Sequence, residues 1–260
     1  MLNFEINGAG KENLVLLHGF MENTTIWKYM EPFLSDKFTI IKIDLPGHGK
    51  SDIIAEVQSM ELMADAVKEV CDHLQISNFH LLGHSMGGYI SLAYAEKYPK
   101  DLKTMTLFFS TYFADDEEKK KTREKSLRII KEAFPNYAKA GIPNLFNSNE
   151  FDVLESEIDF AKEVALSTNN MGALASTKGM IERTDKSKVM ENFEGKILVI
   201  AGKHDNAVRT SATIENLPDS TNIKSYVLDC GHNGHLEKPS ICGEIINTEL
   251  LHNLPKNLVL

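Results

Sequence analysis

Leu81-Leu82-Gly83-His84-Ser85-Met86-Gly87-Gly88-Tyr89 is the stretch that decides the fold of this chain. An apolar run ends on a serine that lies between glycines, and a helical pattern begins directly after it. The spacing Gly83-x-Ser85-x-Gly87 is typical of a sharp strand-to-helix turn that lifts a serine hydroxyl above the end of a sheet. Larger side chains at the two glycines would collide with the neighbouring strand and helix. We therefore predict that Ser85 is a nucleophile.

Length and composition indicate a globular protein with one large domain or two small ones. The chain has 260 residues, of which 42% are hydrophobic and 25% charged, and its formal net charge is −9. An excess of acids argues against a nucleic-acid partner, because binding to a phosphate backbone requires a surplus of bases. The N-terminal residues do not resemble a signal peptide, and no apolar run is long enough to span a bilayer. We expect a soluble cytoplasmic protein without a membrane partner, and the oligomeric state stays open.

Three cysteines, Cys71, Cys230 and Cys242, are an odd number and have no C-x-x-C spacing. This pattern suggests neither a disulfide framework nor a zinc site. We expect all three to be small buried hydrophobic residues.

Short continuous apolar runs alternate with helical patterns over the first 109 residues. Such runs are typical of strands that are buried on both faces. Strands are expected at 13–18, 38–43, 79–82 and 103–109, and helices at 27–33, 59–74 and 86–98. Strict alternation of strand and helix predicts right-handed crossovers and a parallel sheet.

A long helical segment without a convincing strand follows Thr111 and extends to about Lys188. It opens with acids and then bases over 115–121, which we interpret as a solvated helix face. Strands are expected again at 196–201 and 222–228, and a last helix from about Pro239. The chain is therefore predicted to be an α/β core, mostly a doubly wound parallel sheet, that is interrupted by a helical insert.

A serine hydroxyl needs a base that takes its proton, and the base needs a third group that orients it. Asp205 follows the strand that ends at Ala201, and His232 follows the strand that ends near Cys230. Both therefore lie at the carboxyl edge of the sheet, as Ser85 does, and open α/β sheets bind their ligands there. We predict that Ser85, Asp205 and His232 are the catalytic residues.

Asp205 and His232 each have a competitor for the predicted role. Asp115 and Asp116 follow the preceding strand and could supply the acid in place of Asp205. His235 competes with His232 for the role of the base. His84 is read as a structural or exposed histidine.

Four separated stretches, taken in order, resemble the α/β-hydrolase fold family, and in particular its serine esterase-like members with a helical cap. They are Leu17-His18-Gly19-Phe20, Asp44-Leu45-Pro46-Gly47-His48-Gly49-Lys50-Ser51, Gly83-His84-Ser85-Met86-Gly87-Gly88, and Gly231-His232 with Glu237 and Pro239 behind it. The chain order Ser, Asp, His is also the order of this family. The resemblance covers nearly the whole chain.

The resemblance implies a core of residues 1–111 and 189–260 and a cap of residues 112–188 over the pocket. It implies that backbone N–H groups of Phe20 and Met86 form the oxyanion hole, and that the Asp44–Ser51 loop is a structural turn. The family's usual first strand is missing, so about seven strands are expected. The proline that often follows the acid in this family is absent after Asp205.

Two other motifs are weaker candidates for a functional site. Gly49-Lys50-Ser51 ends like a phosphate-binding loop, but Asp44 stands where the first glycine is needed and Pro46 removes a backbone donor. His232 and His235 lack further spaced ligands, which argues against a metal site.

The resulting hypothesis is a serine hydrolase that needs no cofactor or metal. It cleaves a carboxylic ester, with a thioester as a variant, of a small to medium and rather apolar acyl group. A carbon–carbon bond hydrolase with the same triad is the nearest alternative, and a non-catalytic or slow-turnover small-molecule receptor on the same scaffold is an alternative of another class. The physiological substrate is not encoded in these motifs.

Overall fold

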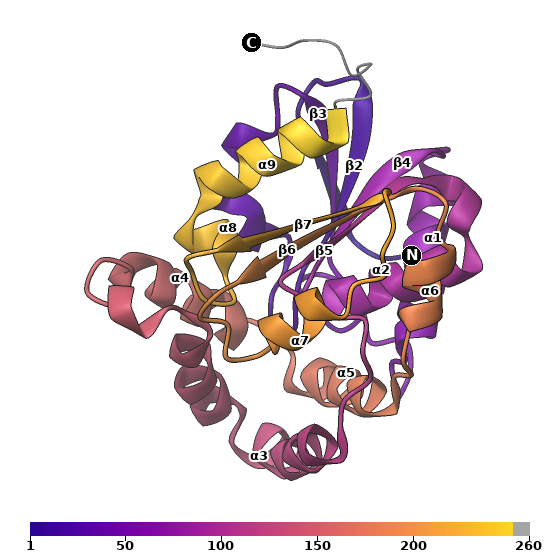
Figure 1. Ribbon diagram of the computed structural model, residues 1–260. Helices are drawn as coiled ribbons and strands as arrows, with labels where there is room; N and C mark the ends of the chain where they lie inside the picture. The colour runs from indigo at the N-terminus through magenta and orange to yellow at the C-terminus, as the bar shows by residue number, and fades with distance from the viewer. Residues whose placement is uncertain (252–260) are drawn as a thin grey trace.

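A seven-stranded sheet forms the centre of the computed structural model, which describes residues 1–251 (Figure 1). The strand order is β1-β3-β2-β4-β5-β6-β7, and β1 runs antiparallel to β3 while every other neighbouring pair is parallel. The strands are β1 (Phe4–Asn7), β2 (Glu12–Leu17), β3 (Phe38–Ile43), β4 (Phe79–His84), β5 (Leu102–Phe108), β6 (Lys196–Gly202) and β7 (Ile223–Leu228). This arrangement confirms the predicted fold class and the expected seven strands.

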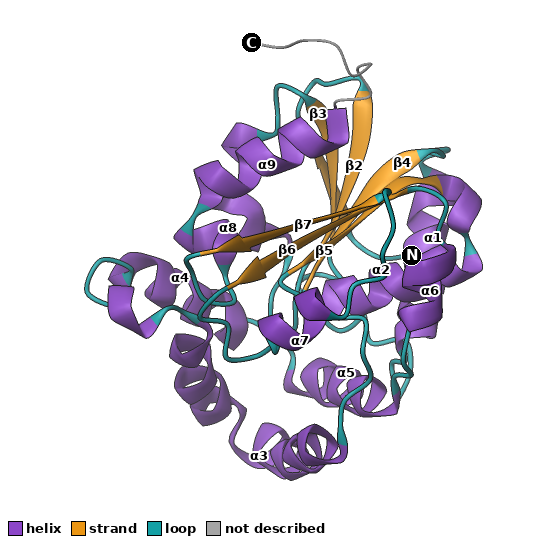
Figure 2. Ribbon diagram, viewed as in Figure 1, coloured by secondary structure: helices purple, strands orange, loops and turns teal. Residues whose placement is uncertain are grey.

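Helices cover both faces of the sheet, as Figure 2 shows. The helices outside the insert are α1 (Met60–His73), α2 (Met86–Lys97), α7 (Thr210–Glu215), α8 (Gly234–Glu237) and α9 (Pro239–Leu251). Alternate residues of β2 enter different cores: Val15 and Leu17 pack in the cluster that contains α1 and α2, and Leu14 and Leu16 in the cluster that contains α9. The continuous apolar runs of the sequence follow from this coverage, because both faces of each central strand are buried.

Two local elements differ from the expectation. The helix expected over 27–33 is a pair of 3-10 helices, Thr24–Tyr29 and Glu31–Phe33. Asn23 caps the first through Thr25, and Pro32 lies in the first turn of the second, where its fixed backbone starts a new short helix rather than continuing the old one. Helix α8, a single turn after His232, was not expected.

The insert between β5 and β6 is helical, and Figure 1 shows α3 and α5 below the sheet, α4 to the left and α6 to the right. It comprises α3 (Glu117–Gly141), α4 (Glu155–Leu166), α5 (Asn170–Glu182), α6 (Ser187–Asn192) and the short 3-10 helices Ile142–Leu145 and Ser148–Glu150. Helix α3 is kinked at Ala133, two residues before Pro135, because proline removes a backbone donor and clashes with the preceding turn. The division into a 112–188 cap and a core of 1–111 and 189–260 stays a prediction.

The turn after β3 is held by one buried carboxylate. Asp44 accepts hydrogen bonds from the backbone N–H groups of Thr24 at 2.8 Å and Lys50 at 2.9 Å, and from the side chain of Asn3 at 2.8 Å. These contacts make the Asp44–Ser51 segment a structural turn, and the backbone N–H of Lys50 is already bound by a carboxylate.

The three cysteines are free and buried. Burial raises the pKa of the Cys71 and Cys242 thiols to about 12, so neither is a reactive thiolate near neutral pH. Within residues 1–251, no helix combines the length and the apolar character that crossing a bilayer would require.

Candidate active site

Ser85 lies at the tight junction between β4 and α2. Its backbone has φ 50° and ψ −112°, a region that residues with a side chain rarely adopt. A Cβ atom at Gly83 would lie 2.2 Å from the carbonyl oxygen of Gly87, and one at Gly87 would lie 2.3 Å from the carbonyl oxygen of Leu17. Helix α2 can therefore approach β4 this closely only with glycine at position 83, and it can approach β2 this closely only with glycine at position 87.

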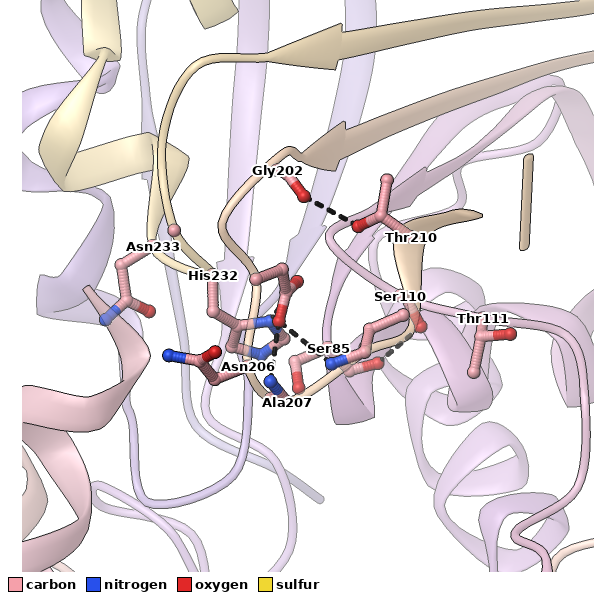
Figure 3. A network of polar contacts seen from close by, with 12 residues as sticks. Ser85, Ser110, Thr111, Gly202, Asn206, Ala207, Thr210, His232 and Asn233 are labelled. Atoms are coloured by element: carbon pink, nitrogen blue, oxygen red, sulfur yellow. Dashed lines mark hydrogen bonds and ion pairs between the residues drawn. The ribbon is translucent and has the colours of Figure 1, made fainter. Parts of the chain in front are cut away.

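Two hydrogen bonds hold Ser85 in this strained conformation. The backbone N–H of Ser85 donates to the carbonyl of Phe108 at 3.0 Å, and the hydroxyl of Ser110 donates to the carbonyl of Ser85 at 2.8 Å (Figure 3). Both partners belong to β5 or to the residues directly after it, so the neighbouring strand fixes the position of the serine.

Asp205 and His232 form a buried pair. The distance from His232 Nδ1 to Asp205 Oδ2 is 2.7 Å, and their side chains are 3% and 0% exposed. The other carboxylate oxygen, Oδ1, accepts the N–H groups of Ala207 at 2.7 Å and Val208 at 2.8 Å. Because a proton on Nδ1 faces the carboxylate, Nε2 of the neutral ring is left as the basic atom.

Ser85 and His232 line the same cavity, which has a volume of about 210 Å³. Figure 3 shows both residues near the loop that carries Asn206 and Ala207. Among the described residues no hydrogen bond joins the Ser85 hydroxyl to the ring of His232. In ligand-free sites such contacts are often long and shorten when substrate binds.

The two expected oxyanion donors lie beside Ser85. Phe20 lines the cavity, and Met86 is the first residue of α2. Neither backbone N–H has an acceptor within residues 1–251, as expected for donors that wait for a ligand. Their role in holding an oxyanion stays a prediction.

The loop that carries His232 is fixed by Glu237 of α8, whose buried carboxylate accepts three backbone N–H groups. The donors are Gly231 at 2.9 Å, Asn147 at 3.0 Å and Asn233 at 3.1 Å. Burial raises the pKa of Glu237, and the three donors act in the opposite direction. In the sequence, Glu237 stands out only as a motif residue behind His232. The contact of Glu237 with Asn147 of the insert depends on the tertiary fold.

A second buried pair, Glu22 and His84, lines the same cavity and was missed by sequence reasoning. Glu22 Oε2 accepts a hydrogen bond from the backbone N–H of Gly19 and lies 3.0 Å from His84 Nδ1. His84 Nε2 lies 3.1 Å from the carbonyl oxygen of His232. Both ring nitrogens of His84 therefore face acceptors, which requires the doubly protonated, positively charged ring.

The pKa shifts of both residues have the directions expected for an ion pair. Burial by itself would lower the pKa of His84, but the charge and hydrogen bond of Glu22 outweigh it and raise the pKa. Burial by itself would raise the pKa of Glu22, but His84 above all holds it well below its usual range. An ion pair thus connects the backbone beside Phe20 with the backbone of His232.

The competing residues are occupied elsewhere. His235 is fully buried against Trp27 and His84, and burial lowers its pKa well below the usual value. Asp115 is paired with Arg123 and Arg183, both at 2.6 Å, rather than with a histidine. The structure therefore brings Asp205, and neither Asp115 nor Asp116, against His232.

Glu22, His84 and His235 are also the one group in the described chain whose ligand atoms lie close enough together to hold a metal ion. The carboxylate and the ring of His84 already neutralise each other, and a metal would have to displace a proton from His84. The arrangement is better explained as a structural ion pair.

A family model described as the alpha/beta hydrolase fold matches residues 12–239. An esterase from Thermogutta terrifontis is 31% identical, with a TM-score of 0.89 over 96% of this chain and 93% of that structure. The enol-lactonase from Burkholderia xenovorans LB400, at 21% identity, a TM-score of 0.87 and 96% coverage of both chains, shares the fold.

Two curated relatives match shorter segments. A dihydrolipoyllysine-residue acetyltransferase component of an acetoin cleaving system from Pseudomonas putida is 37% identical over 107 residues, or 41% of this chain and 29% of the relative. A 2-hydroxy-6-oxononadienedioate/2-hydroxy-6-oxononatrienedioate hydrolase from Escherichia coli K12 is 37% identical over 111 residues, or 41% of this chain and 38% of the relative. The matches thus span about a third of each relative's length.

Proposed function

Because the chain belongs to the α/β-hydrolase fold family, we propose that it is a serine hydrolase that cleaves a carboxylic ester of a small to medium acyl group. The observation that carries the proposal is the buried His232–Asp205 hydrogen bond beside the cavity that Ser85 lines. The likeness to the Thermogutta terrifontis esterase supports it.

The reaction follows from the roles of the three residues. His232 Nε2 accepts the proton of Ser85 Oγ as that oxygen attacks the carbonyl carbon, and Asp205 stabilises the resulting imidazolium. The N–H groups of Phe20 and Met86 bind the oxyanion. His232 then gives its proton to the leaving alcohol, or to the thiolate of a thioester, and an acyl-enzyme remains. Water attacks this ester with His232 as base, and the acid and free Ser85 are released.

Carbon–carbon bond hydrolysis is the second candidate, and the similarity to the Escherichia coli 2-hydroxy-6-oxononadienedioate hydrolase favours it. The same triad would serve, but the proton would be delivered to carbon instead of to oxygen. A receptor that binds a ligand without turnover is the candidate of another class.

Labelling with a fluorophosphonate tests the nucleophile, and turnover of aryl esters tests the reaction. We expect wild-type protein to be labelled and Ser85→Ala to be unlabelled and inactive. Asp205→Asn should lower kcat by about 10⁴ because the amide favours the wrong tautomer of His232. Equal labelling of wild type and Ser85→Ala would contradict the nucleophile assignment, and full activity of Asp205→Asn would move the acid elsewhere. Binding without turnover would favour the receptor.

A further inference from the structure

We infer that the substrate carries a carboxylate that binds to Lys119 and Arg123 of the insert helix α3. The inference rests on the proposed function and adds the chemical class of its substrate, replacing the expectation of a rather apolar acyl group.

Lys119 and Arg123 are four residues apart on α3 and line the cavity that also contains Ser85 and His232. This spacing puts both side chains on one face of the helix. The remaining lining is mainly apolar and includes Phe20, Met21, Leu145, Met180, Ala207 and Val208. An apolar cavity with a few convergent polar groups is the usual form of a small-molecule site. Here those groups include the two cations, the hydroxyls of Tyr89 and Tyr137, and the Glu22–His84 pair.

The positive charges of the cavity wall exceed the acids that accompany them. Lys119 Nζ donates to the carbonyl of Ala207 at 3.0 Å, and in the described chain no carboxylate is paired with it. Arg123 uses Nε alone to bind Asp115, so its two terminal nitrogens have no acceptor within residues 1–251. Asp115 also binds Arg183, so one carboxylate serves two guanidinium groups.

Within residues 1–251, the other acids near the cavity form no ion pair with Lys119 or Arg123. Asp205 lies near enough to favour the charge of Lys119, but it is hydrogen-bonded to His232. Glu22, which lines the cavity, is neutralised by the cation of His84. Asp116 and Glu118 line an adjoining cavity of about 510 Å³, and Asp116 is paired with Arg209 at 3.2 Å. Lys119 lines both cavities, so an anion at its ammonium group would lie between them.

Half-buried cations that outnumber the acids beside them are costly, and a bound anion would reduce that cost. Burial above all, and then the neighbouring Arg123, lower the pKa of Lys119, and the charges of Asp115 and Asp205 oppose this in part. By contrast Lys120, the next residue on α3, is paired with Glu117 at 3.3 Å and lines neither cavity. A planar guanidinium with free terminal nitrogens beside an ammonium group is well suited to a carboxylate.

The position of Lys119 indicates where the charge of the substrate would lie. A half-ester of a short dicarboxylic acid would place its carboxylate at the end opposite the scissile bond, toward Lys119, which also lines the adjoining cavity of about 510 Å³.

The test compares aryl esters that are matched in shape and carry either a carboxylate or an isopropyl group at one end. One pair is phenyl hydrogen glutarate and phenyl 5-methylhexanoate, in which an isopropyl group replaces the carboxylate. The other is 4-carboxyphenyl acetate and 4-isopropylphenyl acetate, which places the charge on the leaving group. In at least one pair we expect wild-type kcat/KM to favour the charged ester by about 10-fold or more, as for a charge-assisted hydrogen bond.

The variants are Lys119→Met and, as matched control, Lys120→Met, which removes one charge from the same helix outside the cavity. We expect Lys119→Met to abolish the preference, because hydrolysis of the charged ester should slow about 10-fold more than hydrolysis of the neutral one. Lys120→Met should keep the wild-type ratio. Arg123→Lys, which retains the charge needed beside buried Asp115, should weaken the preference without unfolding the protein.

The outcomes separate this inference from the proposed function. Hydrolysis without preference for charge in either pair, together with labelling of Ser85, overturns the inference alone. An equal loss on charged and neutral esters in Lys119→Met assigns Lys119 a structural role through Ala207 and also overturns it. Absence of both hydrolysis and Ser85 labelling overturns the proposed function and the inference with it.

Discussion

Glu22 and His84 show at the scale of single residues how the site is held. The pair connects the N–H of Gly19, next to the expected oxyanion donor Phe20, with the carbonyl of His232. Neither residue enters the proposed chemistry. Each positions a backbone segment that does, and because the pair is buried, the loss of one charge leaves the other without a partner.

Glu22→Gln should therefore lower both the stability and the activity of the protein. Removing one partner of a buried ion pair typically destabilises a protein by about 3–5 kcal/mol, and we expect kcat to fall as the backbones of Gly19 and His232 loosen. The free energy of unfolding from urea titrations and kcat on an aryl ester measure the two effects. His84→Gln combined with Glu22→Gln should be less destabilising than Glu22→Gln alone, since no uncompensated charge remains.

The same pair gives a pH dependence with a defined sign. The raised pKa of His84 stabilises the native state fully below its unfolded value, about 6.5, and this contribution is lost as the pH rises through the folded pKa. The lowered pKa of Glu22 stabilises the native state fully above its unfolded value of 4.5. This contribution is lost as the pH falls from there into strong acid. The difference between wild type and Glu22→Gln should be largest near pH 5.5 and smaller at pH 9. A constant difference would contradict the ion pair.

At the scale of elements, the junction of β4 and α2 depends on glycine for a steric reason. A Cβ at Gly87 would meet the backbone of β2, whereas a Cβ at Gly141, at the end of α3, would have no atom within 4 Å. Gly87 thus has no room for a side chain, whereas Gly141 has.

Alanine at these two glycines should have opposite effects on stability. Gly87→Ala should lower the free energy of unfolding by at least about 2 kcal/mol, because α2 must move away from β2. Gly141→Ala should raise it by about 0.5–1 kcal/mol, because alanine has the better helix propensity and its methyl group enters open space. Thermal and urea unfolding measure both, and equal effects would contradict the close contact at Gly87.

Most elements were predictable from local pattern, and the exceptions have local causes. Continuous apolar runs identified β2, β3, β4, β5 and β6 because strands buried on both faces must be apolar throughout. The residues from Trp27 to Phe33 satisfied a helical pattern, yet Pro32 divides them into two 3-10 helices. Helix α8 is too short for periodicity to reveal it.

At the scale of the whole molecule, buried neutral histidines should control stability in acid. Burial lowers the pKa of His48 to about 3 and that of His80 to about 4. Below about pH 6.5 the unfolded chain binds protons at these positions that the native state does not bind, so stability falls as the pH falls toward 4.

His80→Gln tests this dependence. The variant should lose less stability than wild type between pH 7 and pH 4, by roughly 3 kcal/mol at most, because the shift of one histidine contributes about 1.4 kcal/mol per pH unit. Urea titrations across this range measure the slope. The same replacement at His73, an exposed residue, controls for the loss of a histidine as such. Parallel slopes for wild type and His80→Gln would show that His80 is charged in the native state.

The amino-acid sequence by itself was sufficient for the sheet, the insert and the order of Ser85, Asp205 and His232. Buried parallel strands leave a continuous apolar signature, and their carboxyl ends meet at one edge, so residues that follow them converge whatever the details of packing.

Only the tertiary structure decided what surrounds these residues. Glu22 and His84 are 62 positions apart, and Asp115 and Arg183 are 68 apart. Lys119 lay in a charged run that reads as a solvated helix face, yet it lines the cavity of Ser85. The reason is that periodicity encodes which face of an element is apolar, whereas the partner of a buried charge depends on how distant elements pack together.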